Sequence, residues 1–187
     1  MPQNQPAENR VEWEGALVKR ACGGDVRAFE RLYREHVSRV YGLCLRMTRD
    51  PALAEDCAQE TFINAWKALG GFEVRSSFAT WLHRIAVNVV LGRRRKPTVV
   101  VELPAADADA EPLETEWLLE TPMEVDEIER AIEALPEGAR DVLVLNALYG
   151  YSHLETAQML GVAEGTCKAQ LHRARSLLRE RLGVEVR

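Results

Sequence analysis

The sequence predicts an all-α protein of two small helical domains, joined by a flexible acidic linker, with a helix-turn-helix in the second domain. Three observations lead to this prediction. Apolar residues recur at spacings of three and four along most of the chain, and "TVVVE" (Thr98–Glu102) is its one β-branched run. The stretch from Pro97 to about Pro122 is rich in proline, alanine and acids and lacks a sustained period. Residues Ser152–Leu178 contain two helical patterns separated by a glycine turn.

Four helices are expected in the first half of the chain. A short helix over Trp13–Ala21 ends at "CGGD", and a long helix begins at Val26. Asp50 can cap a third helix that has Pro51 in its first turn and runs to about Leu69. A fourth helix is expected to begin near Ser77 and to continue through "RRRK" until Pro97. The apolar side of the long second helix consists of Phe29, Leu32, Tyr33, Val37, Val40, Tyr41, Cys44 and Met47.

The second half predicts a helix over Val125–Leu135, which Pro136 ends, and another over Glu137–Leu148, which Gly150 ends. The helix pair of Ser152–Leu178 follows. We therefore expect a tail with a short first helix over residues 1–24, a first domain over 25–97, a linker over 98–124 and a second domain over 125–187.

Charge is divided unevenly along the chain, whose net charge is −5. From Glu102 to Glu133 twelve acids face one arginine, so this segment carries −11 and the rest of the chain carries +6. A local basic face can therefore still attract phosphate. No apolar run is long enough for a membrane span and no secretory signal begins the sequence, so we expect a cytoplasmic protein.

The sequence offers no pattern typical of a catalytic or metal site. Its four histidines are scattered, and no paired catalytic carboxylates or nucleophile–base set is evident. Cys22, Cys44, Cys57 and Cys167 are far apart and lie among apolar neighbours, which is typical of thiols that act as small hydrophobic residues. We expect no enzyme activity, no metal and no cofactor.

The helix pair of the second domain has the features of a DNA-reading motif. Ser152 and Glu155 have the spacing of a capping box, Gly161 lies where the turn needs a positive φ, and Val162 fills the angle between the helices. Long donors on the outer side of the second helix suit phosphates and guanine edges in a major groove. The alternative is a plain helical hairpin with a solvated basic face. The outer donors are Thr166, Lys168, Gln170, His172, Arg173 and Arg175.

Two stretches of the first domain suggest binding surfaces. In "LAEDCAQETFINAWKAL" the residues Asp56, Gln59, Glu60 and Asn64 lie on or near one polar face, opposite Phe62, Trp66 and Leu69; the alternative is a solvated helix side. The next stretch combines Phe72 with a helix that carries Arg84 and Asn88 and ends in the basic run 93–96, as a surface for single-stranded DNA requires. Four apolar residues of that helix are expected in the core: Phe78, Trp81, Leu82 and Ile85.

The order of these motifs resembles one family, the extracytoplasmic-function (ECF) sigma factors of bacterial RNA polymerase. "AEDCAQETFINAW" is similar to the family's polymerase-binding helix, and "FATWLHRIAVN" to its promoter-melting helix. "LPEGARDVLVLNALYGYSHLETAQMLGVAEGTCKAQLHRAR" is similar to its DNA-reading domain. The resemblance covers about Asp25–Lys96 and Val125–Leu182.

The resemblance implies a factor that binds core RNA polymerase and directs promoter-specific initiation, as a monomer when free, under an anti-sigma factor. It places on the clamp helices of the largest polymerase subunit the residues Asp56, Gln59, Glu60, Phe62 and Asn64. It places on the minus-ten element the residues Phe72, Arg75, Ser76, Arg84, Asn88, Arg93, Arg94 and Arg95. It places on the minus-thirty-five element the residues Thr166, Lys168, Ala169, Gln170, His172, Arg173 and Arg175.

The sequence departs from the family pattern at a few positions. The family often has Ile where Thr156 stands and Val where Cys167 stands, and commonly Ser-Arg where this chain has Ala169-Gln170. The last difference removes one cation that would face DNA. Two other functions remain open at this point: a stand-alone transcription regulator, which would not need the two motifs of the first domain, and a helical adaptor that binds no DNA.

Overall fold

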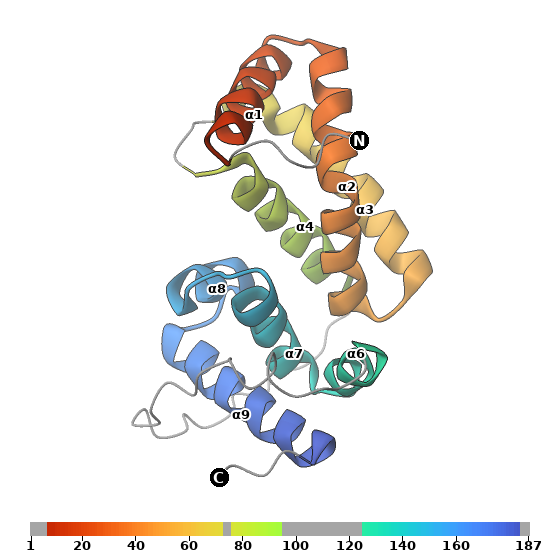
Figure 1. Ribbon diagram of the computed structural model, residues 1–187, viewed down its shortest axis with the longest axis vertical. Coiled ribbons are helices and arrows are strands. Elements are labelled where there is room, and N and C mark those ends of the chain that lie inside the picture. Colours follow the sequence, from red (N-terminus) through yellow and green to blue (C-terminus); the bar gives the residue numbers. More distant parts are fainter. Residues whose placement is uncertain (1–6, 73–75, 95–124, 184–187) are drawn as a thin grey trace. The chain divides into compact units, whose positions relative to one another are not determined.

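The computed structural model describes residues 7–72, 76–94 and 125–183, with the side chains of 7–12 and 125 left aside. The chain divides into two compact units, the first with residues up to Leu45 and Asp50–Val90, the second with Arg46–Arg49 and the chain from Leu91 onward. All regular elements in the described ranges are helices (Figure 1), which confirms the predicted all-α fold. Within those ranges no helix has the length and apolar character of a membrane span.

The first unit is built from α1 (Ala7–Cys22), α2 (Val26–Thr48), α3 (Pro51–Ala68), the short 3₁₀ helix η1 (Leu69–Gly71) and α4 (Phe78–Arg94). The last turn of α4 and the end of α2 belong to the second unit. Figure 1 shows α2 and α3 side by side. Residues from all four α-helices form a common core, because apolar positions three and four apart share one helix face. Its fully buried members include Leu32, Val40, Ala54, Leu82 and Val87.

Capping residues define where the helices of the first unit begin. Asp25 Oδ1 accepts hydrogen bonds from the backbone N–H groups of Arg27 and Ala28 at 3.0 and 3.1 Å, which satisfies two free donors at the start of α2. Asp50 does the same for α3, with Pro51 in the first turn as predicted.

His36 Nε2 lies 2.6 Å from Glu14 Oε1, and this pair joins α2 to α1.

The second unit contains α6 (Val125–Glu133), α7 (Glu137–Leu143), the π-helical η2 (Val144–Leu148), α8 (His153–Leu160) and α9 (Glu164–Leu182). The apolar side of α9 packs against α6, α7 and α8. Leu143 and Leu145 contribute to the core from one side, and Leu171 and Leu178 from the other. Arg140 Nη1 donates to the carbonyl oxygen of Leu135 at 3.0 Å and so closes the turn between α6 and α7.

Several boundaries differ from those expected. α1 begins at Ala7 rather than Trp13, because most of residues 7–12 have high helix propensity although their spacing shows no apolar pattern. The helix expected over Glu137–Leu148 is α-helical only to Leu143 and then widens into a π turn, with Tyr149 N donating to Val144 O at 3.1 Å. The predicted linker over 98–124 and its "TVVVE" run lie outside the described residues.

The cysteines occupy the structural positions that the sequence predicted. Cys44, Cys57 and Cys167 are buried and Cys22 is half-buried, with its Sγ 3.2 Å from the carbonyl oxygen of Leu69. Burial raises the pKa of the Cys44 thiol to about 12 and that of Cys167 to about 11. These two thiols therefore stay protonated at neutral pH and act as small core residues.

Candidate functional site

The outer side of α3 carries the polar residues that the sequence assigned to polymerase binding. Ala54, Cys57, Ala58, Thr61 and Ala65 are buried, so the helix is fixed to the core by small residues. On the opposite side Asp56 and Gln59 are exposed, whereas Glu60 and Asn64 are half-buried. The remaining predicted residue, Phe62, is buried.

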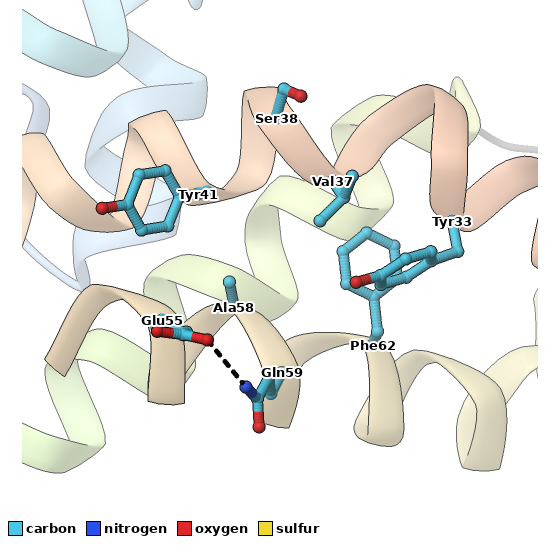
Figure 2. A pocket seen from close by; sticks show the side chains of 8 residues that line it. All are labelled: Tyr33, Val37, Ser38, Tyr41, Glu55, Ala58, Gln59 and Phe62. Atoms are coloured by element: carbon cyan, nitrogen blue, oxygen red, sulfur yellow. Dashed lines mark hydrogen bonds between the residues drawn. The ribbon is translucent and has the colours of Figure 1, made fainter. Parts of the chain in front are cut away.

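A groove of about 460 Å³ lies between α2 and α3 next to this polar side (Figure 2). Phe62 and Tyr33 are in edge contact, with ring centroids 4.7 Å apart, and form its apolar end. Glu55 and Gln59 lie on the α3 side, where Gln59 Nε2 donates to Glu55 Oε1 at 3.4 Å. The groove lining from both helices is Tyr33, Val37, Ser38, Tyr41, Glu55, Ala58, Gln59 and Phe62.

Sequence reasoning missed the α2 side of this groove. Tyr33 was expected to lie on the apolar side of α2 with Leu32 and Val40, but its side chain is 40% exposed. Ile63 and Trp66 of α3 are also exposed, at 54% and 39%. The spacing of Tyr33, Val37 and Tyr41 at one helical turn was a usable signal, because such a stripe can face a neighbouring helix as well as a core. The result is an apolar surface with an acidic and amide rim, which suits a helix that carries cations beside apolar residues.

The surface of α4 carries exposed polar residues along the helix and a cluster of aromatic residues around its start. Ser77 caps the helix: its Oγ accepts from Thr80 N at 3.1 Å and lies 2.8 Å from Thr80 Oγ1. Arg84 and Asn88, one turn apart, are both exposed. Further along the helix, Arg93 is exposed and Arg94 is half-buried.

The aromatic residues around the start of α4 are packed against one another. Phe72 and Trp81 have ring centroids 5.0 Å apart, and Phe78 contacts both rings at 6.1 and 5.7 Å. Phe78 and Leu82 are buried as expected for core residues, whereas Trp81 and Ile85 are only half-buried. Trp81 is thus partly exposed next to the half-buried Phe72. Ser76 is half-buried, and the predicted DNA contacts Arg75 and Arg95 lie outside the described residues.

The geometry of the helix-turn-helix is set by the cap at the start of α8 and by the turn between α8 and α9. Ser152 Oγ accepts from Glu155 N at 3.2 Å while Glu155 Oε2 accepts from Ser152 N at 2.9 Å, which is the predicted capping box. Gly161 has φ +70°, a left-handed conformation that favours glycine, and Val162 N donates to Ala157 O at 3.0 Å across the turn. α9 follows with Cys167, Leu171, Ala174 and Leu178 buried.

The outer face of α9 is narrower than the sequence suggested. Thr166, His172 and Arg173 are exposed, and the half-buried Ala169 lies between them on the same side of the helix. Lys168 is exposed at the margin and is paired with Glu164 at 2.9 Å. Its hydrogen bond lowers the pKa of the Glu164 carboxyl group.

Gln170 and Arg175 are the two predicted DNA-facing residues that lie at the edges of this face. Both are half-buried, and desolvation lowers the pKa of the Arg175 guanidinium group. A Cβ atom placed on Gly138 would lie 3.6 Å from the amide carbon and nitrogen of Gln170. The Gln170 side chain therefore packs against the start of α7. The exposed face between these edges is therefore formed by Thr166, Ala169, His172 and Arg173.

Comparisons with known proteins agree with this division into two helical units. The sequence model of Sigma-70 region 2 matches residues 32–98, and that of Sigma-70 region 4 matches residues 126–178. The chain is 35% identical over 176 residues to the ECF RNA polymerase sigma factor SigM of Mycobacterium tuberculosis, a match that covers 91% of this chain and 85% of SigM. The chain belongs to the ECF sigma factors.

Further similarities support this ECF sigma factor assignment. The RNA polymerase sigma-H factor of Pseudomonas aeruginosa is 36% identical over 184 residues, which cover 89% of this chain and 92% of that protein. Among solved structures, CnrH in complex with the cytosolic domain of CnrY superposes with a TM-score of 0.62 at 25% identity and covers 93% of this chain and 99% of that one. As an ECF sigma factor the chain directs transcription initiation by RNA polymerase. The match to region 2 argues against the stand-alone regulator.

Proposed function

We propose that this ECF sigma factor uses three separate surfaces to bring RNA polymerase to its promoters. The α2–α3 groove and the outer side of α3 bind the clamp helices of the largest polymerase subunit, α4 holds the opened minus-ten element, and α9 reads the minus-thirty-five element. The observation that carries this proposal is the groove of Figure 2, an apolar cavity whose rim includes the Glu55 carboxylate and the Gln59 amide. The exposed Asp56 follows Glu55 in α3. In this role the chain needs no cofactor and no catalysis of its own.

The partners and boundaries follow from the same proposal. An anti-sigma factor holds the protein inactive in the cytoplasm by covering its polymerase-binding surfaces; CnrH, one of the similar solved structures, is in complex with the cytosolic domain of CnrY. Residues 25–97 act as the polymerase-binding and melting domain, 98–124 as the acidic linker and 125–187 as the promoter-anchoring domain. The tail of residues 1–24 includes α1, which the pair of His36 and Glu14 joins to α2.

Polymerase binding is tested by reversing one charge on α3. Asp56→Arg should abolish co-purification with core RNA polymerase, because an exposed carboxylate that meets a basic helix becomes a repulsive cation. Glu127→Arg, the same charge reversal at an exposed position of α6, is the matched control and should bind normally. Thermal unfolding followed by circular dichroism shows whether both variants remain folded. Normal binding by Asp56→Arg would show that the outer side of α3 does not bind polymerase.

The two DNA surfaces are tested separately on a promoter that the wild-type holoenzyme transcribes. Asn88→Ala should reduce formation of the open complex more than binding to closed duplex, because its exposed amide is suited to an unstacked base. Arg173→Ala should weaken promoter binding by about 1–3 kcal/mol if the guanidinium group reads a base. An equal loss in both assays would contradict base capture by Asn88, and an equal loss on all sequences would make Arg173 a phosphate contact.

A further inference from the structure

A second groove of the first unit, between the end of α1 and the first half of α2, has a very different lining from the groove in Figure 2. Its volume is about 360 Å³, and its lining consists of Arg20, Arg27, Ala28, Glu30, Arg31 and Arg34. None of these residues belongs to the α3, α4 or α9 surfaces described above. Four guanidinium groups thus gather around one cavity without a role in the proposed function.

Two of these arginines are held in place by neighbouring carboxylates. Arg20 donates through Nε and Nη2 to Asp25 Oδ2, at 2.9 and 2.6 Å, and this bond lowers the pKa of the Asp25 carboxyl group. Arg34 Nη2 lies 2.5 Å from Glu30 Oε1. Since a guanidinium group has five N–H donors, both arginines keep donors for another acceptor. The pairs therefore orient the cations at the edges of the groove.

The other two arginines supply the excess charge. Arg27 and Arg31 are exposed, and their guanidinium groups make no ion pair or hydrogen bond to another residue in the part of the chain that the structure describes. Four arginines against the carboxylates of Glu30 and Asp25 leave an excess of two positive charges at the groove. An anion that enters the groove can therefore gain new contacts without first breaking an ion pair.

The chemistry of the lining favours a nucleic-acid backbone over an acidic protein. Protein interfaces are anchored by aromatic and large apolar side chains, as the α2–α3 groove would be by Tyr33 and Phe62, whereas this groove offers only Ala28. Interfaces with DNA are more polar and much more positively charged. Arg27, Arg31 and Arg34 are spaced by one turn and then by three residues, so they extend roughly 10 Å along α2. That length corresponds to about three base-pair steps measured along the axis of duplex DNA.

We propose that the α1–α2 arginine groove is an additional phosphate-binding surface that holds the backbone of promoter DNA. This inference rests on the proposed function, because it assumes that the first unit works next to DNA. The groove has no aromatic ring on which a base could stack, so it adds affinity without reading sequence. Its contribution should be of similar size on every promoter.

The test measures how the affinity of the full-length chain for a short fluorescent duplex depends on salt. For wild type, log K falls linearly with log salt, with a slope set by the number of phosphates contacted. The double variant Arg27→Gln/Arg31→Gln should reduce the magnitude of this slope by about 1.8 if it loses two duplex phosphate contacts. Arg27→Lys/Arg31→Lys keeps both charges and should retain the wild-type slope. The control Arg130→Gln/Arg181→Gln removes two cations from exposed positions of α6 and α9 and should change the slope less.

The outcomes separate this inference from its alternatives. An unchanged slope in the double glutamine variant, or an equal drop in the Arg130/Arg181 control, overturns it. Loss of binding to poly-glutamate with the DNA slope unchanged also overturns it, and assigns the groove to an acidic protein. If the wild-type protein binds no DNA and supports no transcription, the proposed function fails as well. If the wild-type protein is active and the double glutamine variant keeps the wild-type slope, the groove inference alone fails.

Discussion

Two buried threonines of this protein differ in one hydrogen bond and so provide a matched pair for a stability experiment. Thr61 in α3 and Thr156 in α8 are both 0% exposed. Thr61 Oγ1 donates to the carbonyl oxygen of Cys57 at 2.7 Å. Within the described residues the Oγ1 atom of Thr156 has no hydrogen-bond partner. A buried hydroxyl group without a partner destabilises the folded state by about 1–3 kcal/mol.

Replacing Thr156 by Val removes this hydroxyl group and retains almost the same shape. We expect Thr156→Val to raise the free energy of unfolding by about 1–2 kcal/mol, since the desolvated group is lost and a methyl group is buried in its place. In a small domain 1 kcal/mol corresponds to about 4–8 °C in Tm. The second unit should therefore melt at least about 4 °C higher. Thr61→Val gives up a hydrogen bond with a net value of about 0.5–1.5 kcal/mol and should show no such gain.

Thermal unfolding of the full-length protein distinguishes the two substitutions. Three of the four tryptophans, Trp13, Trp66 and Trp81, lie in the first unit, so tryptophan fluorescence follows mainly that unit while far-UV circular dichroism follows both. Thr156→Val should shift the dichroism transition of the second unit with little change in fluorescence. Thr156→Ser, which keeps the hydroxyl group, should not be stabilised. A lower melting temperature of Thr156→Val, or an equal stabilisation of Thr61→Val, would show that the Thr156 hydroxyl group does not destabilise the folded protein.

Two further predictions concern the stability of each unit. Burial, followed by the charges of Arg39 and His36, lowers the pKa of His83 from 6.5 to about 4. The unfolded chain therefore binds an additional proton between these values, and stability is full above pH 6.5 and falls by up to about 3 kcal/mol as the pH drops to 4. Urea unfolding at pH 7 and pH 5, read by tryptophan fluorescence, should show this loss in wild type and a smaller one in His83→Gln. In the second unit, Ser152→Ala removes half of the capping box and should lower stability by about 1 kcal/mol in urea titrations, and no change would mean that Glu155 alone caps α8.

Local patterns were sufficient to predict where the helices of this fold occur. Asp50 with Pro51 predicted the start of α3, and Ser152 with Glu155 predicted the start of α8, because capping depends on residues close in the chain. The π turn over Val144–Leu148 was not predictable in this way. Apolar spacing looks much the same whether the backbone closes with α or π hydrogen bonds, so the widened turn leaves no signal in the periodicity.

Those features of the candidate sites that depend on a single helix were predictable from the sequence. The outer positions of α9 follow from its buried stripe, and Thr166 and Arg173 are exposed as expected. The packing of Gln170 against Gly138 depends on how α7 crosses α9, which residue spacing within α9 does not encode. The α2–α3 groove was missed for the same reason, because each of its sides taken alone is part of an ordinary amphipathic helix.

Both grooves of the first unit include residues of α2, but these residues differ, so the functions of the two grooves can be separated by mutation. Arg27, Arg31 and Arg34 line the arginine groove, whereas Tyr33, Val37 and Tyr41 line the groove beside α3. Substitutions of the arginines remove charge and leave the apolar lining beside α3 in place, whereas substitutions at Tyr41 leave the arginines intact. If α2 binds polymerase through its apolar residues and DNA through its arginines, the arginine variants must keep polymerase binding while they lose salt-dependent DNA affinity. Loss of both activities together would mean that the two sets of residues contact one partner.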